Sequence, residues 1–381
     1  MSGHLWGGSE ELWSQVALRL HSEGHQVGVS VTYYPKLSPR VLELERKGID
    51  LFIGKPAQHN LPVRLWNRVK RRFVVEEKKE IQWLRLQKPD LVIISQGGNS
   101  DGVGWMNVCM EMGLPFAAII QCNTEGFWPD DDWGVEMARA YRAAQKVFCV
   151  SRHNLELLER QIGESLQNAV VVWNPYNIST DQLPVWPKDT GVWKMACVAR
   201  LDPAATGQDL LLQALAQKRW QERPVEFNLY GSGRCEQNLL KFAKSLQLKN
   251  VHFRGHIENV KAIWEENHLL VMPSRFEGLP LALVEAMWCA RPSVVTDVGG
   301  NSELCVDEET GFVAEASTVK HLDQTLDRAW SRRHEWQSMG KVARERAEKL
   351  ISKDPIGDFC QHLNECVNRL KVKIEKPLNT L

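Results

Sequence analysis

The chain has 381 residues, too many for one small core, and this length predicts two domains of ordinary size. Basic and acidic residues number 47 each, so the composition argues against an overall basic field that would attract nucleic acid. No run of about 18 apolar residues occurs and the nine cysteines form no C-x-x-C pair, which predicts a cytoplasmic protein with reduced thiols and no spanning helix.

Strand-like and helix-like segments alternate through the first half of the chain. The expected strands are 27–32, 50–53, 90–95, 115–121, 147–150 and 169–173. The expected helices are 9–22, 39–47, 61–87, 103–112, 133–144 and 152–162. This alternation predicts an α/β fold with a parallel, doubly wound sheet. Almost no strand precedes the Gly7–Gly8 turn, so either the true start lies upstream or the sheet lacks its usual first strand.

A second alternating series follows the segment 177–189, whose two prolines and lack of periodicity predict a linker. Its expected strands are 194–198, 226–230, 251–253, 269–272, 293–296 and 311–314. Its expected helices are 208–217, 236–245, 259–265, 281–290 and 319–330. Residues 335–372 are predicted to be helical and long enough to cross back to the first domain. The expected division is 1–176, a linker 177–190, 191–353 and a C-terminal helix 354–381.

The segment LLVMPSRFEGLPLALVEAMWCA, residues 269–290, contains a buried strand, a tight loop and a helix that begins near Pro280. A helix N-terminus that follows a strand is a seat for phosphate. Glu277 and Glu285 lie in this segment, eight positions apart. Because carboxylates repel phosphate, their expected partners are hydroxyl groups of the same ligand, which predicts a sugar nucleotide.

Three further motifs end strands in the second half. Arg200 would clamp a diphosphate with its planar guanidinium, or pair with an acid on the surface. The glycine turn at Gly231 is by itself more typical of a plain turn than of a binding loop. His256 with Ile257 would contact a nucleobase edge, although a lone histidine is more often structural.

Taken together, the elements ARLDPAATGQD, YGSGR, RGHIENV, PSRFEGLPLALVEAM, RPSVVTDVGGNSEL and TGFV resemble the retaining glycosyltransferases of family 4, the glycosyl transferases group 1, which have the GT-B fold. The resemblance covers most of residues 193–316 and extends more loosely to the first half. It implies two Rossmann-like domains that face each other across a cleft, with the donor in the second domain and the acceptor in the first.

The resemblance also implies roles for individual residues. Glu277 and Arg200 would act in catalysis, with Glu277 on the donor sugar and Arg200 on the leaving diphosphate. Glu285 would bind the ribose hydroxyl groups. The expected donor-binding residues are Gly8, Thr206, Gly231, His256, Ile257, Ser274, Gly278, Leu279 and Glu285. The donor would be a UDP-sugar or a GDP-sugar, with no metal ion or other cofactor.

This chain departs from the family pattern at three places. The usual lysine before Gly207 is Thr206, the histidine common in the first domain is replaced by Gln121-Cys122-Asn123, and the first strand is missing. Losing a cation from the diphosphate site would cost transition-state stabilisation. The alternative function is therefore a catalytically weak GT-B protein that binds a glycan or nucleotide as a regulatory or assembly subunit.

The sequence indicates the residues that would bind the acceptor less clearly than those that would bind the donor. Phe127, Trp128 and Trp133 would stack on sugar rings, although core packing is the default role for any one of them. Asp130 to Asp132 have metal-ligand spacing, but a loop and helix start is the favoured interpretation. The basic, partly apolar segment from Arg64 to Phe73 fits either a helix on an anionic membrane or an ordinary solvated helix, and the second is favoured.

These observations predict a hexosyltransferase of polysaccharide biosynthesis with a saccharide or lipid-linked acceptor.

Overall fold

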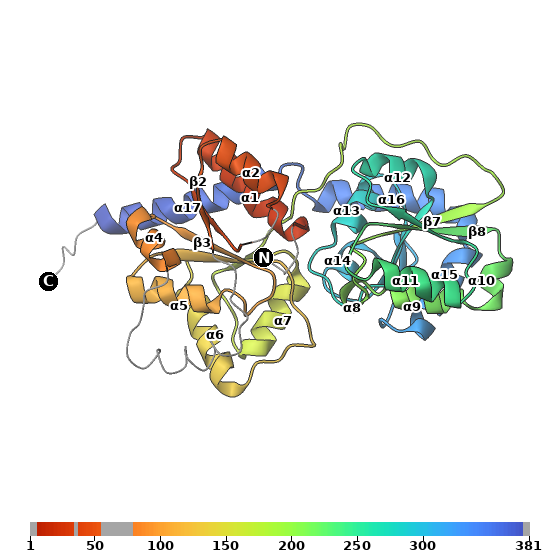
Figure 1. The fold of residues 1–381 in the computed structure, drawn as a ribbon, viewed down its shortest axis with the longest axis horizontal. Coiled ribbons are helices and arrows are strands. Elements are labelled where there is room, and N and C mark those ends of the chain that lie inside the picture. The colour runs from red at the N-terminus through yellow and green to blue at the C-terminus, as the bar shows by residue number, and fades with distance from the viewer. Residues whose placement is uncertain (1–5, 34–36, 55–78, 376–381) are drawn as a thin grey trace.

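A computed structural model of the chain describes residues 6–33, 37–54 and 79–375. Figure 1 shows two lobes side by side. The first lobe contains strands β1 to β6, helices α1, α2 and α4 to α7, and the C-terminal helix α17, and the second contains β7 to β12 with α8 to α16. The predicted basic segment 64–73 and most of the predicted helix 61–87 lie outside the described residues.

The first lobe contains two parallel sheets. Strands β1 (Gly28–Val31) and β2 (Asp50–Ile53) pair with each other. A separate sheet has the order β3 (Val92–Gln96), β4 (Phe116–Ile120), β5 (Val147–Cys149) and β6 (Ala169–Val171). Within the described ranges, no strand connects β1 to β3. The parallel pairing of the predicted strands is confirmed, and their sheet is divided at this point.

Helices cover these sheets, and local signals set their ends. They are α1 (Gly8–Ser22), α2 (Pro39–Arg46), α4 (Lys79–Gln87), α5 (Val103–Met112), α6 (Asp131–Ala143) and α7 (Arg152–Ile162). Ser38 caps α2 and Ser151 caps α7 by accepting a backbone N–H in the first turn. Gly113 and Gly163 end α5 and α7 in the left-handed conformation that glycine adopts without strain.

The second lobe has one parallel sheet of six strands in the order β12-β11-β10-β7-β8-β9. The strands are β7 (Trp193–Val198), β8 (Val225–Tyr230), β9 (Val251–Gly255), β10 (Leu269–Met272), β11 (Ser293–Thr296) and β12 (Gly311–Ala314). The chain winds outward from β7 to β9 and then returns to β10 on the other side of β7. This order confirms the doubly wound prediction and puts the change of winding between β7 and β10.

The helices of this lobe include short ones that the sequence did not predict. They are α8 (Pro203–Thr206), α9 (Gln208–Leu215), α10 (Lys218–Glu222), α11 (Glu236–Ser245), α12 (Val260–Glu266), α13 (Leu281–Trp288), α14 (Asn301–Leu304), α15 (Val319–Ser331), the 3-10 turn η1 (Arg333–Glu335) and α16 (Trp336–Leu350). The helices α8, α10 and α14 have four or five residues, which is too short for a periodic pattern to reveal them.

The C-terminal region contains two helices, so the prediction of one helical run over 335–372 is wrong at residues 351–354. Helix α16 ends at Leu350, and α17 (Pro355–Glu375) begins with a proline, which favours the first position of a new helix over the interior of an existing one. Helix α17 crosses to the first lobe (Figure 1), where Phe359 and Leu363 pack with Leu12 and Phe148. The rings of Phe359 and Phe148 lie 4.5 Å apart, and the predicted crossing is confirmed.

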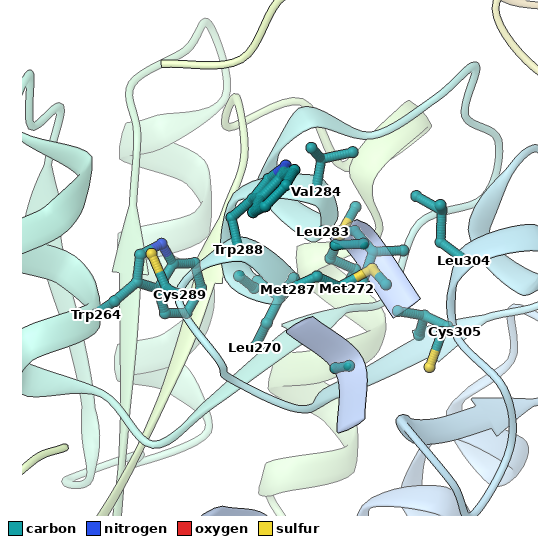
Figure 2. Close-up of a cluster of buried hydrophobic side chains, with 14 of the residues drawn as sticks. Trp264, Leu270, Met272, Leu283, Val284, Met287, Trp288, Cys289, Leu304 and Cys305 are labelled. Atoms are coloured by element: carbon teal, nitrogen blue, oxygen red, sulfur yellow. The ribbon is translucent and has the colours of Figure 1, made fainter. Parts of the chain in front are cut away.

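The main core of the second lobe anchors α13. Leu283, Met287 and Trp288 of this helix are buried against Leu270 and Met272 of β10, as Figure 2 shows. Burial of several large apolar side chains stabilises a helix by a few kcal/mol, about 1.5 to 3 for each side chain. The position of the α13 N-terminus is therefore set by the core beneath it.

Candidate functional site

The loops that follow β7 and β10 form the centre of the candidate site. Strands β7 and β10 pair in parallel, so both loops emerge at the same edge of the sheet. Arg200 follows β7, and Glu277 lies in the β10–α13 loop, residues 273–280. In doubly wound sheets, ligands bind at this edge, where the winding changes.

The β10–α13 loop is held in place on several sides. Arg275 pairs with both carboxylate oxygens of Asp209, at 2.6 and 2.8 Å, and its backbone N–H donates to the carbonyl of Ala205. The Thr296 hydroxyl donates to the Ser274 carbonyl at 2.6 Å. These bonds come from the β7–α9 segment and from β11, so the loop conformation is fixed by the protein itself.

Glu277 is half-buried and points toward Ser274, whose hydroxyl donates to Oε1 at 2.8 Å. Burial raises the pKa of Glu277 to about 7, while the Ser274 hydrogen bond and the charge of Arg200 oppose this rise. A carboxyl group with a pKa near 7 can accept or donate a hydrogen bond at neutral pH. Glu277 therefore suits contact with ligand hydroxyl groups.

Arg200 is held through its backbone. Its carbonyl accepts hydrogen bonds from the Thr206 hydroxyl at 2.9 Å and from Nε2 of Gln208 at 2.8 Å. Its Nε atom is buried and has no partner among the described residues. The guanidinium is therefore positioned with hydrogen-bonding capacity to spare, which is what an anion site requires.

Thr206, a predicted donor-binding residue, is buried, and its hydroxyl lies 2.9 Å from the carbonyl of Asp202 and 2.7 Å from Oε1 of Gln208, besides the Arg200 carbonyl. The hydroxyl is therefore surrounded by protein acceptors in the segment that carries Arg200.

Gly278 and Leu279 follow Glu277 in the β10–α13 loop and carry backbone N–H groups. Both residues are buried, and neither N–H donates to any group in the described part of the chain. They come just before α13, whose N-terminus carries the positive end of the helix dipole. Unpaired N–H groups at such a position form a seat for an anion.

Glu285 lies one helical step inward on α13 and is 5% exposed. Its Oε1 accepts the backbone N–H of Asn177 at 3.1 Å, and its second oxygen has no partner among the described residues. Burial raises the pKa of Glu285 to about 7, and the Asn177 bond opposes this rise. Asn177 begins the segment between the lobes, so Glu285 connects α13 to that segment.

The glycine turn of the first lobe faces these groups. A methyl group placed on Gly7 would lie 4.0 Å from Nη1 of Arg200, and one placed on Gly8 would lie 2.8 Å from Cδ1 of Leu281. The turn therefore brings the start of α1 against both Arg200 and the first turn of α13. A side chain at Gly8 would fill the space between the lobes.

Two more glycines let the lobes approach each other closely. A methyl group on Gly278 would lie 1.8 Å from the carbonyl oxygen of Gln121, which follows β4. A methyl group on Gly300 would lie 3.1 Å from Cβ of Ser151, at the start of α7. Gly300 also donates its N–H to the Gly278 carbonyl at 2.8 Å.

The predicted donor-binding residues Gly231, His256 and Ile257 follow strands β8 and β9 of the same sheet. Gly231 has a φ of +128°, and a methyl group there would lie 2.0 Å from the Ala199 carbonyl oxygen, so only glycine fits beside the Arg200 segment. His256 is exposed at the end of β9, and Ile257 packs partly against the main core. The described structure shows no direct contact between His256 and Arg200 or Glu277.

The structure adds four residues to the site that the sequence analysis did not single out. Asp209 and Arg275 brace the β10–α13 loop, as described above. Glu10, next to the glycine turn, is 3% exposed and accepts a hydrogen bond from the Ser9 hydroxyl at 2.6 Å. Glu303 binds the first lobe through backbone N–H groups. Three of the four, Asp209, Arg275 and Glu303, lie inside the motifs quoted above, but their long-range partners could not be found from spacing.

The aspartates at 130–132 begin a helix, as favoured from the sequence. Oδ1 of Asp130 accepts the Trp133 N–H at 2.8 Å and caps α6. Within residues 6–33, 37–54 and 79–375, no group of three or more His, Cys, Asp or Glu side chains is arranged to hold a metal ion. The same residues include no helix that is both long enough and apolar enough to cross a membrane.

The chain is similar to known glycosyltransferases in sequence. Residues 194–332 match the family model described as "Glycosyl transferases group 1". An uncharacterized glycosyltransferase of Methanocaldococcus jannaschii is 24% identical over 212 residues, which cover 54% of this chain and 56% of that protein. A GDP-mannose-dependent monoacylated alpha-(1-6)-phosphatidylinositol monomannoside mannosyltransferase of Corynebacterium glutamicum is 33% identical over 141 residues, 35% of this chain and 36% of that protein.

The matched regions therefore span about half or less of these relatives. The similarity in structure extends further. Anabaena HepE, solved in complex with UDP and glucose, superposes with a TM-score of 0.70 at 16% identity and covers 97% of each chain. At this identity the likeness establishes the fold. The chain therefore has the two-lobed GT-B fold, and its residues 194–332 match the group 1 glycosyl transferases.

Proposed function

We propose that this chain is a retaining glycosyltransferase that moves a hexose from a nucleotide diphosphate sugar to a saccharide or lipid-linked acceptor, without a metal ion. The observation that carries the proposal is the convergence of Arg200, the unpaired N–H groups of Gly278 and Leu279, and the Glu277 carboxyl at one edge of the second sheet. The match of residues 194–332 to group 1 glycosyl transferases supports the same assignment.

The diphosphate would lie between Arg200 and the N-terminus of α13. Arg200 supplies a cation with an unpaired Nε, and α13 supplies N–H groups and its dipole. Gly8 lies beside Leu281 in the first turn of this helix, so the first lobe contacts the second next to the proposed diphosphate position.

The nucleoside would extend away from this seat. The second oxygen of Glu285 has no partner among the described residues and would accept the ribose hydroxyl groups. The end of β9, with His256 and Ile257, would contact the base. Glu277 would accept hydroxyl groups of the hexose, on the opposite side of the diphosphate.

In the reaction, the bond between the anomeric carbon and the diphosphate oxygen breaks, and its electron pair stays on the diphosphate. The acceptor hydroxyl forms the new bond on the same face of the sugar. Its proton passes to the departing phosphate oxygen. Arg200 and the α13 N-terminus stabilise the negative charge that develops, which is the type of contact that lowers the barrier most.

The relatives suggest which donors to test first. The Anabaena structure contains UDP and glucose, and the Corynebacterium protein is named for its dependence on GDP-mannose. UDP-hexoses and GDP-hexoses are therefore the leading donors, and the acceptor would belong to polysaccharide or glycolipid assembly.

A thermal-shift screen of nucleotide sugars tests the donor, because a ligand that binds only the folded protein raises its melting temperature. Donor hydrolysis and transfer would follow for each hit, with and without EDTA, and NMR would give the anomeric configuration. We expect turnover that EDTA does not reduce, with retention. Tight nucleotide binding with no turnover on any donor would favour the non-catalytic alternative, and an inverted product would contradict the mechanism.

A further inference from the structure

We propose that Glu303 and His153 link the two lobes and position the acceptor-side loop, residues 121–128, over the β10–α13 loop. The inference rests on the proposed function, because it assigns this link to the binding of the acceptor. Glu303 lies on α14 of the second lobe, and His153 lies in the first turn of α7 in the first lobe.

The Glu303 carboxylate binds the N-terminus of α7. Oε1 accepts the backbone N–H of His153 at 2.8 Å, and Oε2 accepts that of Arg152 at 3.1 Å. A helix N-terminus leaves its first N–H groups without partners inside the helix, and its dipole favours a negative charge there. Glu303 supplies both the hydrogen-bond acceptors and the negative charge, although it lies 150 residues from His153 in the sequence. The contact therefore joins the two lobes.

Glu303 is itself held firmly beside the candidate site. Arg346 of α16 donates to the carbonyls of Glu303 and Leu304 at 2.8 and 2.9 Å, which fixes the end of α14. At its start, Gly300 donates to the Gly278 carbonyl in the β10–α13 loop. Helix α14 is therefore bonded at one end to α16 and at the other to the loop that carries Glu277.

The first turn of α7 is also hydrogen-bonded to the acceptor-side loop. Nε2 of His153 lies 2.9 Å from Oε1 of Glu125 in that loop. At the next position, Oδ1 of the buried Asn154 accepts the backbone N–H of Asn123 at 3.0 Å. The backbone of His153 is thus bound by the second lobe, while side chains of α7 bind the loop.

The acceptor-side loop contacts the β10–α13 loop directly. A methyl group on Gly278 would lie 1.8 Å from the Gln121 carbonyl oxygen, so the two loops touch next to Glu277. Burial, and secondarily the carboxylates of Glu277 and Glu125, raise the pKa of Cys122 to about 12. Movement of the loop would therefore change the space beside Glu277, where the acceptor must approach the donor sugar.

The experiment compares Glu303→Ala, Glu303→Gln and His153→Ala with the control Glu309→Ala, an exposed glutamate of the same lobe. We expect Glu303→Ala to lower kcat/KM for the acceptor at least about tenfold and to change the nucleotide Kd less than about twofold. Glu303→Gln, which keeps one acceptor oxygen, should lose less. His153→Ala should raise the acceptor KM, because it frees Glu125 but keeps the backbone bond.

Hydrogen exchange gives a readout that does not depend on activity. Glu303→Ala should speed amide exchange at residues 122–127 and 152–154, whereas Glu309→Ala should not. Unchanged exchange there, or equal losses in acceptor kcat/KM and nucleotide affinity, would overturn the link. Wild-type inactivity on every donor would instead contradict the proposed function, and the exchange data would still decide whether the link exists. If Glu303→Ala fails to fold, Glu303→Gln supplies both measurements.

Discussion

The two sides of the candidate site are built differently. The donor side consists of two loops of one sheet, held by local turns and by the Arg275–Asp209 pair within the second lobe. The acceptor side depends on contacts that cross between lobes, at Gly278 with Gln121 and at Glu303 with α7. The donor side is thus held mainly within the second lobe, with the Gly7–Gly8 turn added from the first, whereas the acceptor side is assembled only when the lobes meet.

This difference predicts that donor-side changes act on chemistry or nucleotide binding, and that cross-lobe changes act on the acceptor.

Glu277→Ala should lower kcat for transfer about 10³-fold, the loss typical for removing one positioned polar group that acts in the transition state. The nucleotide Kd, measured by calorimetry, should stay within about twofold, because the proposed function puts Glu277 on the sugar side of the diphosphate. Glu309→Ala, which changes an exposed glutamate before β12 in the same lobe, serves as the control. Transfer at the wild-type rate would remove Glu277 from the site.

Arg200→Ala should lower kcat about 10²-fold and also weaken binding of the nucleoside diphosphate, because it removes a cation from the anion site. Arg142→Ala, a surface arginine paired with Glu164 in the first lobe, is the matched control. A variant with normal affinity for UDP and GDP and normal turnover would place the diphosphate elsewhere.

Glu285 should make stability depend on pH. Between about pH 4.5 and 7 the folded protein keeps a proton on this carboxyl that the unfolded chain has released, because burial raises its pKa to about 7. The contribution of this carboxyl to stability is therefore fully present below about pH 4.5 and is lost as pH rises from there through 7, by about 3 kcal/mol.

Urea unfolding of the wild type and Glu285→Gln at pH 5 and pH 8 measures this term. The amide cannot ionise, so the free energy of unfolding of the variant should decrease less between pH 5 and pH 8 than that of the wild type. An identical pH dependence in both proteins would show that Glu285 keeps an ordinary pKa.

Thr206→Val should have the smallest effect. It keeps the shape but removes the hydroxyl that bonds the Arg200 carbonyl, at a cost of about 1 kcal/mol in stability. A loss in kcat of about fivefold should follow if the Arg200 segment loosens. Thr190→Val, which changes an exposed hydroxyl, is the control. A loss larger than that of Arg200→Ala would mean that Thr206 itself contacts the ligand.

Much of the fold could be predicted because its signals are local. Strands 50–53, 269–272, 293–296 and 311–314 have the predicted bounds, since short apolar runs there are bordered by turn residues. The helical run predicted over 335–372 is interrupted at 351–354, next to the predicted start of the C-terminal helix at residue 354, and Pro355 begins the new helix. Helices of four or five residues were missed because they contain about one turn.

The motif spacing predicted which loops would meet at the edge of the second sheet, because parallel strands that follow one another in a doubly wound order bring their carboxyl ends together. It could not show which way each side chain points. Thr206 and Ser274 were grouped together as donor-binding residues. In the structure, Thr206 bonds the backbone that carries Arg200, and Ser274 bonds Glu277.

The sequence by itself predicted the alternating strands and helices of both halves, a phosphate site before α13 and the pair of glutamates, because each depends on neighbouring residues. Only the tertiary structure decided how the halves meet. The bonds from Glu303 to α7 and from Glu285 to Asn177 join groups more than 100 residues apart. No local propensity encodes such pairs, and they form only when the packing of α13, α14 and α17 has placed both partners within hydrogen-bond distance.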